Sequence, residues 1–215
     1  MAQRPVFVPF KRRPFADACP VEFPWSSGTS VTQKQKNVAA LHRAYSARFP
    51  QRQVLEISSK SLQPLGVQLS AFNLKMTVPG LDRPVPIECV YQGGKRFAVG
   101  GPYTDLYTAS PRDAKRDSRL SSSGMLRGFS FDGTSFPLQP ASAFYNWLYL
   151  RALMENEELA VQLLDYDGFT DIEFNPNRGV SCQAQAAAVY VSLARQGLLA
   201  QCRSGEDFLA LMSGK

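Results

Sequence analysis

Five prolines lie among the first 24 residues, and their spacing constrains the fold more than any other feature of the sequence. Proline lacks a backbone N–H and has a fixed φ, so a helix cannot continue through a segment with a proline at every fourth to sixth residue. Aromatic residues are interspersed with these prolines, which argues against a freely solvated linker. We therefore expect residues 1–30 to form an extended arm laid over the body of the protein.

Periodicity predicts one helix and two strands after this arm. Thr29 or Ser30 is a suitable N-cap for a helix that runs to about Phe49, where the next residue is a proline. Apolar and polar side chains alternate over residues 54–58, which predicts a strand, and residues 68–78 are a second candidate.

Helical patterns are more frequent in the second half of the chain. Residues 144–154 are apolar almost all round, which predicts a buried helix. Asn156 is suited to cap a helix through Leu164, and Ser181 begins an Ala-rich helix that Gly197 ends. The sequence therefore predicts an α+β fold, in which a predominantly helical single domain lies over a few short strands.

The net charge of +6 is confined to the start of the chain. Residues 1–60 hold ten Lys and Arg against three acidic residues, whereas the remaining residues hold fourteen against fifteen. This excess predicts an anionic partner, nucleic acid before membrane, because phosphate neutralisation is the commonest use of such a cluster. A solvated basic face is the alternative. We expect residues 1–50 to pack as a basic arm and helix on a body formed by residues 51–215.

The rare residue types exclude several classes of protein. With His42 as the single histidine, expected on a helix surface, most zinc hydrolases, Ser–His–Asp triads and Cys–His proteases are excluded. The four cysteines are scattered without a CxxC pair, so neither a disulfide framework nor a zinc site is expected. We expect no cofactor and no metal. No apolar stretch is long enough for a membrane span and no secretory signal is visible, so the expected location is cytoplasmic.

One polar motif lies within residues 86–97. If this segment is helical, then Glu88, Tyr91, Gln92 and Lys95 share one face, because they are spaced by three, four and seven residues. A carboxylate there is suited to acid–base work at a glycosidic centre. A lysine is suited to bind phosphate or to form a Schiff base with an opened sugar. The alternative is an ordinary surface helix, and the two glycines that follow Gln92 weaken the helix prediction.

A second motif is a turn-rich loop that leads into the last long helix. It contains Asn175, Asn177, Arg178, Ser181 and Gln183. Free N–H groups and the dipole at a helix N-terminus attract anions, and the arginine adds a positive charge. The loop is therefore a candidate site for a phosphate or diphosphate. An ordinary capped loop is the alternative.

Two further segments carry polar groups suited to an anionic substrate. The loop-rich region of residues 100–140 contains Arg112, Lys115, Arg116 and Asp117, which could neutralise a diphosphate or pair among themselves on the surface. Ser59 and Lys60 follow the first predicted strand, and their hydroxyl and amine are expected to face a cleft.

Taken in order, these strings resemble the NADAR superfamily. LSAF at Leu69–Phe72, the E-x-x-Y-Q-x-x-K motif that begins at Glu88, and AKRD at Ala114–Asp117 precede an Asn- and Gly-containing loop and an Ala-rich helix. The full strings SSKS, LSAFNL, ECVYQGGKRF, GGPYTDLY and NPNRGVSCQAQAAA are similar to one branch, the antitoxins paired with ADP-ribosyltransferase toxins of the DarT class. The resemblance covers roughly residues 54–195.

The resemblance implies hydrolysis of an N-glycosidic bond, namely removal of ADP-ribose from modified guanine in nucleic acid, with single-stranded DNA as the expected substrate. It places Glu88 in the pocket and assigns an amine role to Lys95 or Lys60. It also implies that Ser59 and Ser70 contact the substrate, and that a cognate DarT-class toxin is a partner. This sequence departs from the wider family at residues 171–177, where a Trp- and Gly-rich stretch is replaced.

Two other functions stay open. The first is an N-glycosidase that acts on riboflavin-pathway intermediates, as some members of the wider family resemble. A substrate of that kind gains nothing from a strongly basic N-terminal segment, which argues against it. The second is a non-catalytic module that binds ADP-ribosylated nucleic acid or the toxin.

Overall fold

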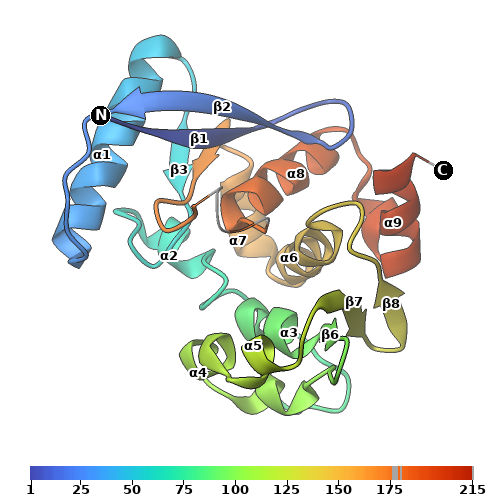
Figure 1. Ribbon diagram of the computed structural model, residues 1–215. Helices are drawn as coiled ribbons and strands as arrows, with labels where there is room; N and C mark the ends of the chain where they lie inside the picture. The colour runs from blue at the N-terminus through green and yellow to red at the C-terminus, as the bar shows by residue number, and fades with distance from the viewer. Residues whose placement is uncertain (176–178, 180, 215) are drawn as a thin grey trace. The chain divides into compact units, whose positions relative to one another are not determined.

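A computed structural model describes residues 1–175, 179 and 181–214, which form two compact units. The first unit consists of Met1–Ser70 with Glu157–Leu199, and the second of Ala71–Asn156 with Ala200–Lys215. In chain order the elements (Figure 1) are β1 (Ala2–Pro9), β2 (Ala16–Phe23), α1 (Val31–Arg48), β3 (Val54–Glu56), α2 (Pro64–Gln68), β4 (Lys75–Met76), β5 (Val85–Pro86), α3 (Ile87–Gly93), β6 (Lys95–Phe97), η1 (Thr104–Thr108), α4 (Pro111–Arg116), α5 (Arg119–Ser122), β7 (Leu126–Phe131), β8 (Thr134–Phe136), α6 (Ala143–Glu155), α7 (Glu157–Leu163), β9 (Gly168–Thr170), α8 (Gln183–Arg195), η2 (Leu199–Cys202) and α9 (Gly205–Ser213).

The predicted α+β class is confirmed by the described residues. They form sheets of four, two and three strands, with helices between the strands along the chain. A predominance of helix is not clearly supported, because the N-terminal quarter contributes two eight-residue strands. None of the helices in the described part of the chain has both the length and the apolar character needed to cross a bilayer.

The first unit is built on a four-stranded sheet in the order β2-β1-β9-β3 (Figure 1). β1 and β2 form an antiparallel hairpin in which Pro5 lies opposite Pro20. Two prolines at one rung of the ladder leave the neighbouring rungs free to pair. Residues 1–30 are extended, as expected, but β1 pairs with β9 at Phe7 and Phe169 and so belongs to the sheet rather than lying over it. The division of the chain at residue 50 stays a prediction.

The predicted helix after this hairpin is confirmed as α1. The Ser30 hydroxyl accepts a hydrogen bond from the Gln33 N–H at 3.2 Å, which caps its first turn. Val38, Leu41 and Tyr45 recur at helical spacing and are buried. Together with Val6, Val21, Phe23 and Ile172 they form one apolar core of the first unit.

The second unit contains an antiparallel meander of β6, β7 and β8 and the helix α6. The buried helix predicted over residues 144–154 is confirmed, since ten of the residues of α6 are buried. Phe144 packs against Phe129 and Phe136, each with ring centroids 4.9 Å apart. This aromatic core supports α3, because Gly94, the C-cap of that helix, lies close against the ring of Phe144.

Three boundaries differ from the sequence predictions. The strand expected over residues 68–78 is wrong apart from Lys75–Met76, because the chain before it forms helix α2 and a run of turns. The helix expected through Lys95 ends at Gly93, where a Cβ atom would lie 2.5 Å from the ring of Tyr107. Helix α8 begins at Gln183, two residues later than expected.

Candidate active site

The second unit places a carboxylate, an amide and an amine in one hydrogen-bonded chain. Glu88 lies in the first turn of α3 and is only 6% exposed. The Gln92 amide, one helical turn later, donates to the Glu88 carboxylate at 2.9 Å. Lys95, the first residue of β6, donates from its Nζ atom to the Gln92 amide oxygen at 2.7 Å. The predicted grouping of these three side chains is therefore present, although Lys95 lies outside the helix.

The environment of Lys95 makes its side chain easier to deprotonate than that of an exposed lysine. Burial lowers the pKa of its side chain, and the positive charge of Lys115 adds to this effect, while the Glu88 carboxylate opposes it. Lys95 Nζ also lies 4.9 Å from the centre of the Tyr91 ring. A lysine with a lowered pKa is a better nucleophile at neutral pH than an exposed one.

Tyr91 is part of the wall that buries this amine. Its ring stacks with Phe129 at 5.5 Å and meets Tyr145 edge-on at 5.0 Å between centroids. The ring therefore supplies a hydrophobic surface beside Lys95, and its predicted contact with substrate stays a prediction.

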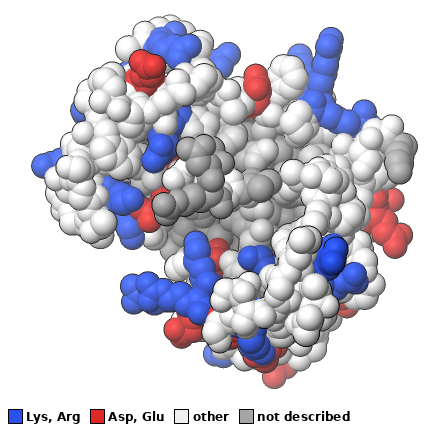
Figure 2. Space-filling view, in the orientation of Figure 1, with Lys and Arg blue, Asp and Glu red and all other residues white. Residues whose placement is uncertain are grey.

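Helix α4 contributes one residue of the predicted basic cluster to this group. Lys115 Nζ lies 3.8 Å from Glu88 Oε1, and its side chain is 59% exposed. Arg112 and Arg116 are exposed on the same helix, and basic side chains gather over it at the lower left of Figure 2. Their role in binding an anion stays a prediction.

Asp117, by contrast, is occupied by a neighbouring arginine. Its carboxylate accepts three hydrogen bonds from Arg119, two from the guanidinium and one from the backbone N–H. These hydrogen bonds hold the pKa of Asp117 below its usual value. Arg119 also pairs with Asp105 at 2.6 Å. Self-pairing thus accounts for this part of the cluster.

The first unit holds Ser59 and Lys60 directly after strand β3. Lys60 Nζ donates to the Ser59 hydroxyl at 3.0 Å, and the Lys60 backbone N–H donates to the Ser58 hydroxyl at 3.1 Å. The Ser70 hydroxyl, also in this unit, donates to the carbonyl of Val67 at 2.7 Å, which ends α2. The substrate contacts predicted for these side chains stay predictions.

A buried carboxylate that the sequence analysis missed holds this serine turn. Glu56 accepts hydrogen bonds from the Ser58 and Thr170 hydroxyls, both at 2.6 Å, and from the Ile172 N–H at 2.8 Å. His42 Nε2 lies 2.8 Å from Thr170 Oγ1, so its expected surface position is wrong. Burial lowers the pKa of His42 to about 4. For Glu56, the only signal in the sequence is that a charged residue lies within the alternating segment of residues 54–58.

The loop predicted to bind phosphate is described only in part. Asn177 and Arg178 lie outside the described residues. The Asn175 carbonyl accepts a hydrogen bond from Gly179 at 3.1 Å. Gln183 and Ser181 each take part in further polar interactions. Gln183 hydrogen-bonds the buried Asp171, whose pKa burial raises to about 8. Anion binding by this loop stays a prediction.

A model of one family matches nearly the whole chain. It describes the DarT1-associated NADAR antitoxins and matches residues 2–215. The chain belongs to this family. The match confirms the resemblance and extends it beyond residues 54–195, to the basic N-terminal segment. A comparison with curated proteins gave no match.

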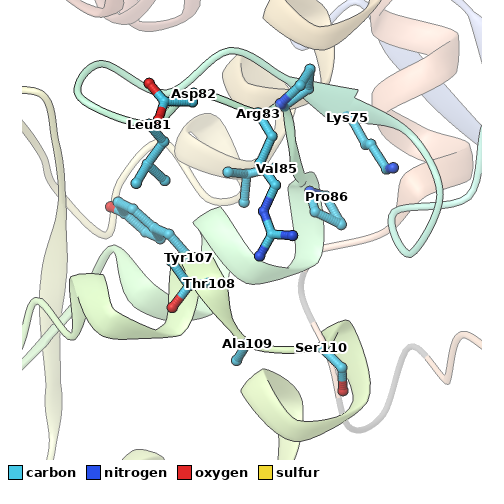
Figure 3. A pocket seen from close by; sticks show the side chains of 11 residues that line it. Lys75, Leu81, Asp82, Arg83, Val85, Pro86, Tyr107, Thr108, Ala109 and Ser110 are labelled. Atoms are coloured by element: carbon cyan, nitrogen blue, oxygen red, sulfur yellow. The ribbon is translucent and has the colours of Figure 1, made fainter.

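A hollow lies on the second unit of this NADAR antitoxin. It has a volume of about 560 Å³ and is lined by Lys75, residues 81–86 and residues 107–110. Figure 3 shows the side chains of Lys75, Arg83 and Tyr107 around it. No predicted site residue lines this pocket. Its walls come from turns and short elements, which carry no periodic pattern.

Across the described ranges, no three His, Cys, Asp or Glu side chains are grouped so as to hold a metal ion.

Proposed function

We propose that this antitoxin is an ADP-ribosyl glycohydrolase that removes ADP-ribose from modified guanine in single-stranded DNA. The observation that carries the proposal is the chain from Glu88 through Gln92 to Lys95, in which a buried carboxylate and a half-buried amine flank one amide. Membership of the DarT1-associated family supports the antitoxin role and a cognate DarT toxin as partner.

The two ionisable groups have separate tasks in this proposal. The Glu88 carboxylate stabilises the positive charge that develops at the anomeric carbon of the ribose as its bond to guanine weakens. The bond from the anomeric carbon to guanine breaks, and the guanine nitrogen leaves with its electron pair and takes a proton. The Lys95 amine bonds to the anomeric carbon and loses a proton. The bond between that carbon and the ring oxygen then breaks, the ring oxygen keeps the electron pair and takes the proton, and the opened ribose is held as an imine. Water adds to the imine carbon, which releases ADP-ribose and restores the amine.

Lys95 is favoured over Lys60 for the amine because its pKa is lowered by burial. Lys60 and Ser59 are instead suited to hydrogen-bond phosphate oxygens. On α4, Lys115, Arg112 and Arg116 are the groups proposed to neutralise the diphosphate, since they are exposed and positively charged.

The test is incubation of the purified protein with a guanine-ADP-ribosylated single-stranded oligonucleotide, followed by mass spectrometry of both products. Release of ADP-ribose with restored guanine is the expected result. Addition of borohydride during turnover should trap the imine as a stable adduct on the protein. Peptide mapping then identifies the lysine that carries it.

Three variants separate the possible roles. Lys95→Met should abolish both release and adduct, whereas Lys60→Met should keep the adduct and weaken substrate binding. Lys75→Met is the matched control for Lys95→Met, because it removes an exposed lysine of the second unit, to which Lys95 also belongs. Substrate that stays intact with folded wild-type protein would overturn the glycohydrolase proposal. Tight binding of that intact substrate would instead identify a non-catalytic module.

A further inference from the structure

The closed end of the β1–β2 hairpin carries three consecutive cations beside an aromatic ring. Lys11, Arg12 and Arg13 are exposed, and the preceding Phe10 is 43% exposed. Figure 2 shows basic side chains projecting from this end of the hairpin, at the upper right. Among the residues that the structure describes, no acidic side chain forms an ion pair with Lys11 or Arg12.

This loop is anchored at its base within the first unit. The Phe10 N–H donates to the Phe15 carbonyl at 3.0 Å, and the Phe15 N–H donates to the Arg12 carbonyl at 2.7 Å. The Ser192 hydroxyl of α8 donates to the Phe10 carbonyl at 2.6 Å. The side chain of Phe15 is buried. The cations are therefore presented on a fixed turn, which reduces the entropy lost on binding.

Lys11 and Arg12 are not neutralised by an ion pair within the described part of the chain. Asp17, the nearest acidic residue on β2, uses its carboxylate to accept the Ala18 N–H at 2.9 Å. Proteins that bind single strands combine cations along the phosphate backbone with aromatic rings on which unpaired bases stack. An acidic protein surface would satisfy the cations but would leave the ring of Phe10 uncovered, so the observations favour nucleic acid.

We propose that the hairpin turn of residues 10–15 binds the single strand that carries the modified base, with Lys11, Arg12 and Arg13 on its phosphates and a base stacked on Phe10. The inference rests on the proposed function for the identity of the substrate. The proposed surface belongs to the first unit, whereas Glu88 and Lys95 belong to the second unit.

The experiment measures binding of a fluorescent, unmodified single strand by anisotropy at several salt concentrations. Replacing the three cations by serine should weaken binding and reduce the slope of log affinity against log salt by about 2, since each phosphate contact on a single strand contributes about 0.7. Phe10→Ala should weaken binding by about fivefold or more and leave that slope unchanged.

A matched variant with serine at Lys36, Arg43 and Arg203 removes the same charge from exposed positions elsewhere. Equal effects of the two triple variants on the slope would show a general charge effect and overturn the proposal. Unchanged affinity in both the triple variant of the turn and Phe10→Ala would also overturn it. Equal affinity for a duplex of the same sequence would argue against the stacked base. If the turn variants kept their affinity for the single strand but lost binding to the cognate toxin, the turn would be a toxin-binding surface and the proposal would be overturned. Failure of the glycohydrolase proposal is seen separately, as absence of ADP-ribose release from the modified strand.

Discussion

The amide of Gln92 lies between the amine of Lys95 and the carboxylate of Glu88, and it hydrogen-bonds both. Lys95 Nζ donates to its oxygen at 2.7 Å, and its nitrogen donates to Glu88 at 2.9 Å. The amide thereby gives each charged group a neutral partner. A direct ion pair would stabilise the protonated lysine and raise its pKa. The amide therefore helps to keep the amine available.

Gln92→Leu should lower the rate of ADP-ribose release by about tenfold or more, because both groups lose the hydrogen bond that orients them. Gln92→Glu should instead move the rise of the rate to higher pH, since an added carboxylate stabilises the protonated amine. Single-turnover rates measured against pH check both outcomes. Identical profiles for wild type and Gln92→Glu would remove Lys95 from the chemical step.

The wild-type rate should itself depend on pH through Lys95. Its pKa is lowered by burial, so the neutral amine forms as the pH rises through a midpoint below the usual lysine value of about 10.4. The imine-forming rate should therefore increase across that midpoint and then level off. Borohydride trapping at a series of pH values measures this directly. A rate that falls over this range would contradict the proposed role of the amine.

Glu88→Gln should preserve the buried shape and reduce turnover by about 10²- to 10⁴-fold, as expected for loss of a group that acts on the reacting centre. Binding of the modified oligonucleotide should be retained. Rapid-mixing kinetics and anisotropy on the same preparation check both parts. Asp113→Asn is a suitable control, because Asp113 is an exposed carboxylate of the same unit. Full activity of Glu88→Gln would exclude an essential carboxylate.

The stability of the protein should fall as the pH rises from about 6.5 to about 8. Burial raises the folded-state pKa of Asp171 to about 8, so the folded protein keeps a proton that the unfolded chain has lost, and this stabilisation disappears as the pH approaches 8. His42 acts in the opposite direction at lower pH. Its folded-state pKa is about 4, below its usual value of 6.5, so its effect is to raise the free energy of unfolding as the pH rises from about 4 to 6.5.

Denaturant unfolding at several pH values measures the free energy of unfolding across this window. Asp171→Asn should flatten the dependence, whereas Asp165→Asn, an exposed carboxylate of the same unit, should leave it unchanged. A wild-type curve without slope in this window would show that Asp171 is ionised in the folded protein.

Local signals in the sequence predicted the long helices well. Ser30 caps α1 through a side-chain hydrogen bond that depends on its nearest neighbours, and α6 is apolar on all sides. The motif of Glu88, Gln92 and Lys95 was also found, because a helical turn aligns the first two residues. Its end was misplaced, since the requirement for Gly93 comes from Tyr107, a contact between residues distant in sequence.

Long-range contacts explain what was missed. Glu56 is satisfied by Thr170 and the Ile172 N–H, more than a hundred residues away, and no local pattern reports such a partner. The sequence predicts an arm rather than a hairpin in a sheet, because the pairing with β9 joins Phe7 to Phe169, which lie far apart in the chain. Proline density predicted an extended backbone, but it carries no information about which strand lies alongside.

The sheet of the first unit also sets the order of events during synthesis. β1 and β3 both pair with β9, so the strands made first have to wait until residues 168–170 leave the ribosome. The larger part of the second unit, Ala71–Asn156, is translated in the interval, so its meander and α6 can begin to pack before Ala200–Lys215 completes that unit. A nascent chain stopped before β9 therefore exposes the edges of β1 and β3, which makes it a substrate for chaperones and proteases until translation is almost complete.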